Sequence, residues 1–202
     1  MIWAIGDVHG RITSYEKLVN SIRKSDPEAI TYQVGDLGIG FQGVNLPILT
    51  PNDWFIAGNH DNAVACAKSP RYLGDYGIHR IDEQTIFFMR GATSVDKHLR
   101  TEGIDWWSWE ELTYSDLIRA IEFYKESKPD IVITHDCPSQ FKDRFFSKLK
   151  TSSFTNEALG QMFDYWQPQH WVFGHYHCYA EKIIGKCKFQ CLAELQHKLI
   201  SR

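Results

Sequence analysis

The sequence of 202 residues contains no long hydrophobic run, no C-x-x-C pair, no large excess of one charge and no internal repeat. A membrane-spanning helix needs about 20 consecutive apolar residues, and no stretch approaches that length. The opening run MIWAIGDVHG lacks a basic segment before its apolar residues, which argues against a secretory signal peptide. With 22 Lys and Arg against 25 Asp and Glu, the overall charge favours neither nucleic acid nor an anionic membrane as a partner.

The five cysteines are an odd number and form no metal-binding or redox pair in the sequence. Such usage is typical of a reducing compartment, where thiols are buried as small hydrophobic groups. We therefore expect a cytoplasmic protein that makes no membrane contact.

What the chain does contain is a regular succession of short apolar runs and amphipathic segments. The length and the ordinary 43% hydrophobic content predict one mixed α/β domain over residues 1–202. Apolar runs and alternating patterns predict strands at 1–5, 30–34, 54–57, 78–81, 85–89, 131–134 and 171–173, and a final pair around 183–184 and 189–195. Amphipathic spacing predicts helices at 11–24, 115–127 and 155–165, the last with Thr155 as N-cap.

Five of the predicted strands end in a residue type that binds metals. The five groups, in chain order, are Asp7-x-His9, Gly35-Asp36, Gly58-Asn59-His60-Asp61, His135 and Gly174-His175-x-His177. In an α/β sheet, ligands bind at the carboxyl ends of the strands, so the topology can bring these distant groups together. Imidazole, carboxylate and amide donors suit Mn, Fe, Zn, Co or Ni better than a site of oxygen ligands alone.

The order D-x-H, GD, GNH[DE], H and GHxH resembles the calcineurin-like metallophosphoesterase superfamily over residues 7–177. This resemblance implies a four-layer α/β/β/α fold, in which two mixed sheets pack as a sandwich flanked by helices. It also implies two divalent metal ions, with Mn favoured and Fe, Zn, Ni or Co as alternatives. The implied ligands are Asp7, His9 and His177 for one ion, Asn59, His135 and His175 for the other, and Asp36 as the bridge between them.

The resemblance further implies hydrolysis of phosphate esters by a hydroxide that bridges the two ions. In this scheme His60 is catalytic, because it stabilises the transition state or protonates the leaving group. Asp61 is placed with it, as a carboxylate that orients the His60 ring.

The second motif departs from that of the protein Ser/Thr phosphatases, which reads GD-x-x-D-R-G and binds phosphate through its Arg. Here it reads Gly35-Asp36-Leu37-Gly38-Ile39-Gly40, without that Arg. Residues 90–109 are the best substitute, because they combine cationic, hydroxyl and aromatic side chains. The candidate substrate-binding residues are Arg90, Lys97, Arg100, Trp106 and Trp107. The tryptophans could equally pack against the 115–127 helix.

A second basic stretch at 142–150 allows three interpretations: a lid, a nucleic-acid contact, or a solvated surface segment, which is favoured. We expect an enzyme that hydrolyses mono- or diesters of a small, nucleotide-sized substrate. The alternatives are a nuclease or nucleic-acid end-processing phosphatase, and a scaffold without catalysis like the retromer subunit of the superfamily. Nucleic acid is a less favoured partner, and no sequence feature predicts an oligomeric state.

Overall fold

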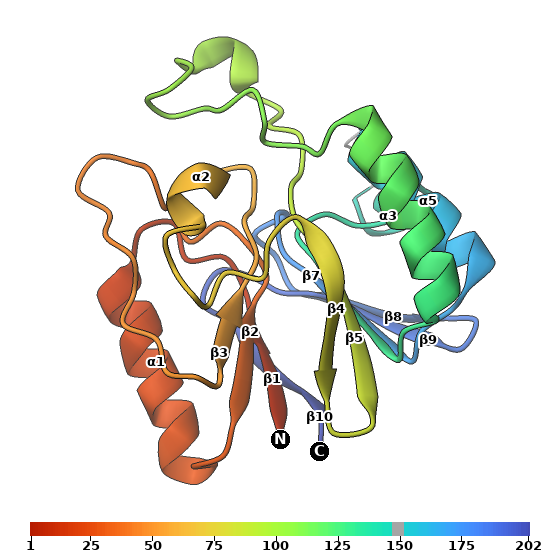
Figure 1. Cartoon of the computed structure of the whole chain (residues 1–202), viewed down its shortest axis with the longest axis horizontal. Helices are drawn as coiled ribbons and strands as arrows, with labels where there is room; N and C mark the ends of the chain where they lie inside the picture. The colour runs from red at the N-terminus through yellow and green to blue at the C-terminus, as the bar shows by residue number, and fades with distance from the viewer. Residues whose placement is uncertain (147–151) are drawn as a thin grey trace.

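Two β-sheets lie face to face in the computed structural model, which describes residues 1–146 and 152–202 (Figure 1). The first sheet has the strand order β10-β1-β2-β3. Its strands are β1 (Ile2–Ile5), β2 (Ile30–Gln33), β3 (Asp53–Phe55) and β10 (His197–Ser201). The second sheet has the order β4-β5-β6-β7-β9-β8. Its strands are β4 (Tyr76–Ile81), β5 (Gln84–Met89), β6 (Ile131–Thr134), β7 (His170–Phe173), β8 (Ala180–Ile184) and β9 (Cys187–Cys191).

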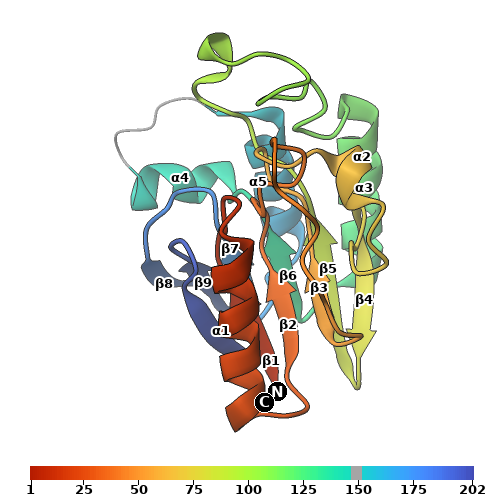
Figure 2. The same ribbon diagram turned by 90° about the vertical axis from the view of Figure 1, so that its left-hand side faces the viewer.

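Helices cover the outer faces of both sheets, so that three apolar cores separate four layers (Figures 1 and 2). Helix α1 (Ile12–Ser25) packs Tyr15, Val19 and Ile22 into a core with the first sheet. A second core lies between the sheets. The third joins the second sheet to α3 (Tyr114–Ser127) and α5 (Phe154–Tyr165). The predicted α/β/β/α sandwich is therefore confirmed.

The parallel strands explain why the motifs can meet. Strands β1, β2 and β3 run parallel to one another, as do β5, β6, β7 and β9. The carboxyl ends of parallel strands lie at the same edge, where the following loops can share one site. The two chain termini lie at the other end of the sandwich (Figure 1), because β10 pairs antiparallel with β1 and brings Ser201 opposite Ile2.

Several local predictions need correction. The N-cap of α5 is Ser153, whose side chain accepts a hydrogen bond from the backbone N–H of Asn156 in a capping box. The Thr155 hydroxyl instead donates to Glu111, 2.6 Å away. Strand β9 ends at Cys191 rather than continuing to 195. The elements that no sequence pattern predicted are β10, α2 (Ala63–Cys66), the 3-10 turn η1 (Lys97–Leu99) and α4 (Ser139–Phe145).

Part of the basic stretch at 142–150 forms the end of α4, and its residues 147–150 lie outside the described residues. Within the described residues, no helix is both long and apolar enough to cross a membrane. The five cysteines are free thiols, as expected. Four of them are buried, whereas Cys178 is exposed.

Candidate metal centre

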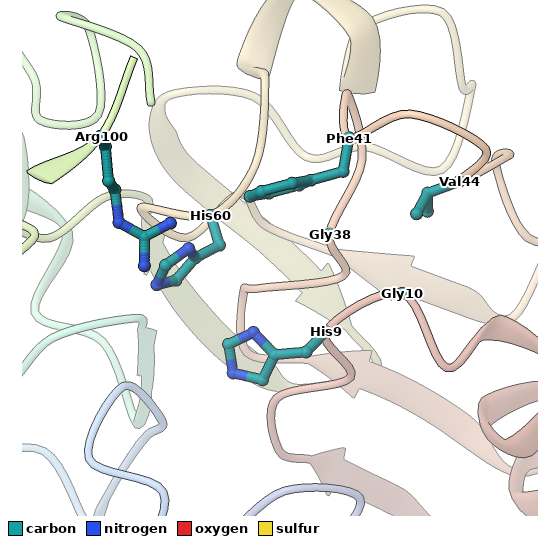
Figure 3. Close-up of a pocket in the computed structure, with 7 residues that line it drawn as sticks. All are labelled: His9, Gly10, Gly38, Phe41, Val44, His60 and Arg100. Carbon is teal, nitrogen blue, oxygen red and sulfur yellow. The ribbon is translucent and has the colours of Figure 1, made fainter. Parts of the chain in front are cut away.

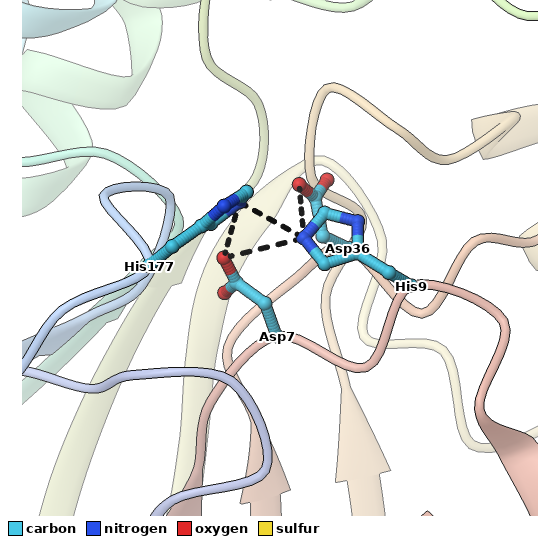
Figure 4. Close-up of side chains that lie close together, drawn as sticks. All are labelled: Asp7, His9, Asp36 and His177. Carbon is cyan, nitrogen blue, oxygen red and sulfur yellow. Dashed lines mark hydrogen bonds and ion pairs between the residues drawn. The ribbon is translucent and has the colours of Figure 1, made fainter.

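Four of the predicted ligands form a compact cluster at the ends of β1, β2 and β7. One donor atom from each of Asp7, His9, Asp36 and His177 lies within 4.8 Å of the other three (Figure 4). His9 Nε2 is 2.9 Å from His177 Nε2, 3.9 Å from Asp7 Oδ2 and 3.8 Å from Asp36 Oδ2. Two imidazole nitrogens and two carboxylate oxygens therefore face one shared point, as the ligands of a cation do.

The remaining ligand candidates lie on the other side of Asp36. His135 Nε2 is 3.3 Å from Asp36 Oδ1 and 3.0 Å from Asn59 Oδ1. His135 Nδ1 lies 2.9 Å from the Val34 carbonyl, so this bond leaves Nε2 directed at the other donors. The His175 ring lies beside that of His135, with 5.1 Å between the ring centroids. The structure thus brings all seven predicted ligands into one site with Asp36 in the middle.

Observations independent of the motif fit the binding of a divalent cation beside Asp36. Asp36 Oδ2 is buried, yet no hydrogen-bond partner reaches it within the described part of the chain. An unpaired buried carboxylate oxygen is costly unless a cation compensates it. Two glycines lie so close to the carboxylates that any side chain there would collide with them. A Cβ on Gly58 would lie 2.1 Å from Asp36 Oδ1, and one on Gly174 would lie 2.0 Å from Asp7 Oδ1.

The backbone at the site is strained. Among the described residues seven non-glycine residues have positive φ, and four of them are predicted ligands. These four are His9, Asp36, His175 and His177, with φ between 48° and 69°. The left-handed conformation costs about 1–2 kcal/mol per residue, and such strain clusters at functional sites.

Two of the candidate imidazole ligands are already in the neutral form that metal binding needs. Burial lowers the pKa of His9 and that of His175 to about 4, so both rings are neutral at pH 7 and can act as ligands. Burial raises the pKa of Asp7 well above its usual range. Burial alone would also raise the pKa of Asp36, but the adjacent His135 ring outweighs this and lowers it. A cation would favour the carboxylate form of both acids.

The structure gives Asp61 a role other than orienting His60. Its buried carboxylate accepts hydrogen bonds of 2.7 to 3.1 Å from four backbone N–H groups. The donors are Leu37, Gly38, Ile39 and Gly58. Asp61 therefore ties the loop after β2 to the loop after β3, and it acts as a positioning residue for Asp36 and Asn59. His60 donates its backbone N–H to Asp36 Oδ1 over 2.7 Å.

A cavity of about 350 Å³ adjoins the cluster (Figure 3). Of the five predicted substrate residues, Arg100 lines it; the complete lining is His9, Gly10, Gly38, Phe41, Val44, His60 and Arg100. Arg100 is held by two 2.8 Å bonds to the carboxylate of Asp96 and by a 3.2 Å bond to the Asp105 carbonyl.

The other four predicted substrate residues are not among those lining this cavity. Arg90 is buried and donates to Asp75 and to the Trp109 carbonyl, which is a structural role. Trp107 is buried behind the Phe41 ring, 5.4 Å between centroids. Trp106 is half-buried, and Lys97 is exposed on η1.

Sequence reasoning missed three kinds of contributor. Phe41 and Val44 line the cavity from the loop after β2, and Ser94 accepts a 3.0 Å hydrogen bond from Asn59 Nδ2. Glu194, in the loop after β9, has Oε1 3.7 Å from His177 Nδ1 and 3.9 Å from His9 Nε2. None of these residues belongs to a motif, so only the fold reveals them.

Comparisons with known proteins agree with this architecture. The family model described as calcineurin-like phosphoesterase matches residues 1–179. This match confirms the resemblance that the motifs carry. No curated protein sequence gives a significant match.

Three solved structures are similar in fold. A Staphylococcus aureus protein provisionally described as a 5′-nucleotidase has a TM-score of 0.58 at 13% identity, and the match covers 96% of this chain and 48% of that one. GAP50, the anchor in the inner membrane complex of Plasmodium, has a TM-score of 0.57 at 12% identity, and the match covers 95% of this chain and 70% of that one. Phosphopantetheinyl hydrolase from Mycobacterium tuberculosis has a TM-score of 0.52 at 12% identity, and the match covers 96% of this chain and 89% of that one.

Proposed function

Because the chain belongs to the calcineurin-like phosphoesterase family, we propose that it hydrolyses phosphate mono- or diesters of a small molecule with two divalent cations, Mn²⁺ being favoured. The observation that carries the proposal is the position of Asp36. Its carboxylate lies between two groups of donors, and its buried Oδ2 has no hydrogen-bond partner among the described residues.

The chain supplies ligands for both cations. Asp7, His9 and His177 would hold one, Asn59, His135 and His175 the other, and Asp36 both. When bound, such a pair polarises the phosphate ester and lowers the pKa of a water molecule between the ions.

Two further side chains act on the substrate. Arg100 is fixed by Asp96 and borders the cavity, where its charge can bind phosphate oxygens. Burial lowers the pKa of His60, so that at neutral pH its uncharged ring offers one N–H donor to the leaving oxygen or to the phosphate.

Hydrolysis of p-nitrophenyl phosphate and bis-p-nitrophenyl phosphate tests the proposal. Both are assayed with Mn²⁺ and with a chelator, for the wild type, Asp36→Asn and the exposed turn variant Asp82→Asn as control. We expect turnover that needs metal and falls by more than about 100-fold in Asp36→Asn. Replacing a residue that only hydrogen-bonds to a metal ligand already lowers metal affinity or activity by about 10–100-fold, and Asp36 is itself a proposed ligand. The control should match the wild type, and the preferred ester shows which bond type the site favours.

Two rival functions correspond to other outcomes. Metal binding without turnover of either ester would favour a scaffold, and the fold likeness to GAP50, described as an anchor, makes this rival concrete. A scaffold would also be indifferent to His60→Ala. Release of phosphate from DNA or RNA ends, or cleavage within them, in preference to small esters would favour the nucleic-acid alternative.

A further inference from the structure

The cavity beside the metal centre is built from two unlike halves (Figure 3). His9, His60 and Arg100 form a polar end next to the cluster, whereas Phe41 and Val44 line the other part with side chains that have no hydrogen-bonding group. Ligand sites commonly combine apolar walls with a few convergent polar groups. The polar end suits a phosphate group, and the apolar wall suits what the phosphate is attached to.

The Phe41 ring is held in place before any ligand arrives. It packs edge to face on Trp107, which is only 1% exposed. The preceding Gly40 has φ of 108°, and a Cβ there would lie 2.9 Å from the Trp107 ring. Asp61 accepts a hydrogen bond from the Ile39 N–H, which fixes the start of the same loop. The aromatic wall is thus attached to the same loop that carries Asp36.

Arg100 is also fixed but retains hydrogen-bonding capacity. A guanidinium has five N–H donors, and bonds to the described residues Asp96 and Asp105 use three of them. Figure 3 shows the group pointing toward His60. The remaining donors can therefore bind an anion at the polar end.

The distances set the size of the substrate. The His9 and His60 ring centroids are 5.3 Å apart, and those of His60 and Phe41 are 6.1 Å apart. A phosphate at the His9 and His60 end thus lies within a few ångströms of a group that stacks on Phe41. Aromatic rings stack with centroids about 4.5–7 Å apart, so a ring attached to the phosphate directly or through a short link can reach this wall.

We propose that this site selects phosphate esters that carry a flat aromatic group, with the ring against Phe41 and the phosphate between Arg100 and the metal centre. The inference rests on the proposed function, because it names the class of ester that the same site takes. An aryl phosphate and a nucleoside monophosphate share this chemistry and differ in the length of the link.

Three esters test the proposal: phenyl phosphate, adenosine 5′-monophosphate and glycerol 2-phosphate. Their kcat/KM values are measured with Mn²⁺ for the wild type, Phe41→Ala, Phe41→Leu and the exposed control Phe154→Ala. Dividing the kcat/KM of each variant by that of the wild type for the same ester cancels the intrinsic reactivity of the leaving group. Stacking of a base on an aromatic side chain contributes about 5- to 150-fold to binding.

We expect Phe41→Ala to lower kcat/KM for at least one aromatic ester about tenfold more than for glycerol 2-phosphate. Phe41→Leu, which keeps apolar bulk without a flat ring, should show the same preference in weaker form. The aromatic ester that loses more identifies the length of the link. Arg100→Ala should lower all three by a similar factor, because every ester carries the phosphate.

An equal loss for all three esters in Phe41→Ala, or no loss, would overturn the inference while leaving the proposed function intact. Mn²⁺ affinity measured on the same variants shows whether the loop and Asp36 keep their positions. If the wild type hydrolyses none of the three esters, nor the nitrophenyl esters, then the proposed function itself fails. These outcomes are therefore distinguishable.

Discussion

At Asn59 the orientation of one amide group decides whether the second half of the site offers an oxygen or a nitrogen. Metal ligation needs the amide oxygen. Asn59 Nδ2 donates to Ser94 Oγ over 3.0 Å, which leaves Oδ1 facing His135. Ser94 is itself held, because its backbone N–H donates to the buried Glu110 carboxylate over 3.1 Å. A residue outside every motif thus fixes a predicted ligand.

Replacing Ser94 tests this dependence. We expect Ser94→Ala to weaken Mn²⁺ binding at the proposed site of Asn59 by about tenfold, since partners of metal ligands contribute about 10–100-fold to affinity. The other proposed site should keep its affinity, because the side chain that Ser94 bonds is that of Asn59. Isothermal titration calorimetry separates the two steps, and Ser108→Ala, on an exposed residue, is the matched control. Equal weakening of both steps would assign Ser94 a general structural role instead.

At the scale of elements, the side chain of Asp53 connects β3 to helix α1, to strand β2 and to the loop before β3. The buried carboxylate at the start of β3 binds Arg23 of α1, Thr31 of β2 and Thr50 of the preceding loop. Burial alone would raise the pKa of Asp53, but these hydrogen bonds outweigh it and hold the pKa below its usual value. Ionised Asp53 therefore stabilises the packing of α1 on the sheet.

The sign of the pH effect follows from that depressed pKa. The contribution is fully present above the unfolded pKa of about 3.9 and is lost as pH falls through the lower folded pKa. We expect Asp53→Asn to reduce the free energy of unfolding by about 3 kcal/mol at pH 7, because it leaves Arg23 without its partner. Urea unfolding with chelator present measures this, and the gap to the wild type should shrink below pH 4. A gap that is independent of pH would contradict the ionic explanation.

The elements differ in how far the sequence predicts them, and the reason is the number of constraints on each. Strands β1, β6 and β7 are buried and end in a motif, so apolar runs and ligands indicate them together. Strand β10 reads HKLIS, with mixed exposure and no motif, and it forms because the β1 edge offers it a partner. A pattern within the segment carries no information about such a partner.

The loop that follows β5 shows the same limit. Arg90 and Arg100 are equally good candidates in the sequence, but Arg90 continues directly from β5 and is buried against Asp75 and Trp109, whereas Arg100 follows η1 and reaches the cavity. Phe41 lies in a loop whose path is set by hydrogen bonds to Asp61 and by contact with Trp107. These are tertiary contacts, so the motifs alone could predict the cluster of candidate ligands but not the wall beside it.

On the scale of the whole molecule, we expect ionised Asp7 to stabilise the fold only when a cation is bound beside it. Asp7 and Asp36 are buried close together, and burial raises the pKa of Asp7. A folded carboxyl group with a raised pKa keeps a proton that the unfolded chain releases. Without metal, the contribution of Asp7 to stability therefore falls as pH rises from about 3.9 toward the raised pKa. The buried charge of Asp7 is thus a cost to the protein without metal.

Asp7→Asn separates the two effects of this carboxylate. At pH 8 with chelator, we expect the variant to unfold at the same temperature as the wild type or higher, because the amide carries no buried charge and can still accept the His175 N–H. Mn²⁺ at about 100 times its dissociation constant adds about 2.7 kcal/mol to the wild type, a rise in Tm of about 5–10 °C for a chain of this length. The Tm of the variant should rise far less with Mn²⁺.

Thermal unfolding followed by circular dichroism, with Asp82→Asn as control, measures the Tm with chelator and the rise in Tm with Mn²⁺. If Mn²⁺ raised both Tm values equally, then the metal would be binding elsewhere, whereas a less stable apo variant would mean that Asp7 supports the fold without metal.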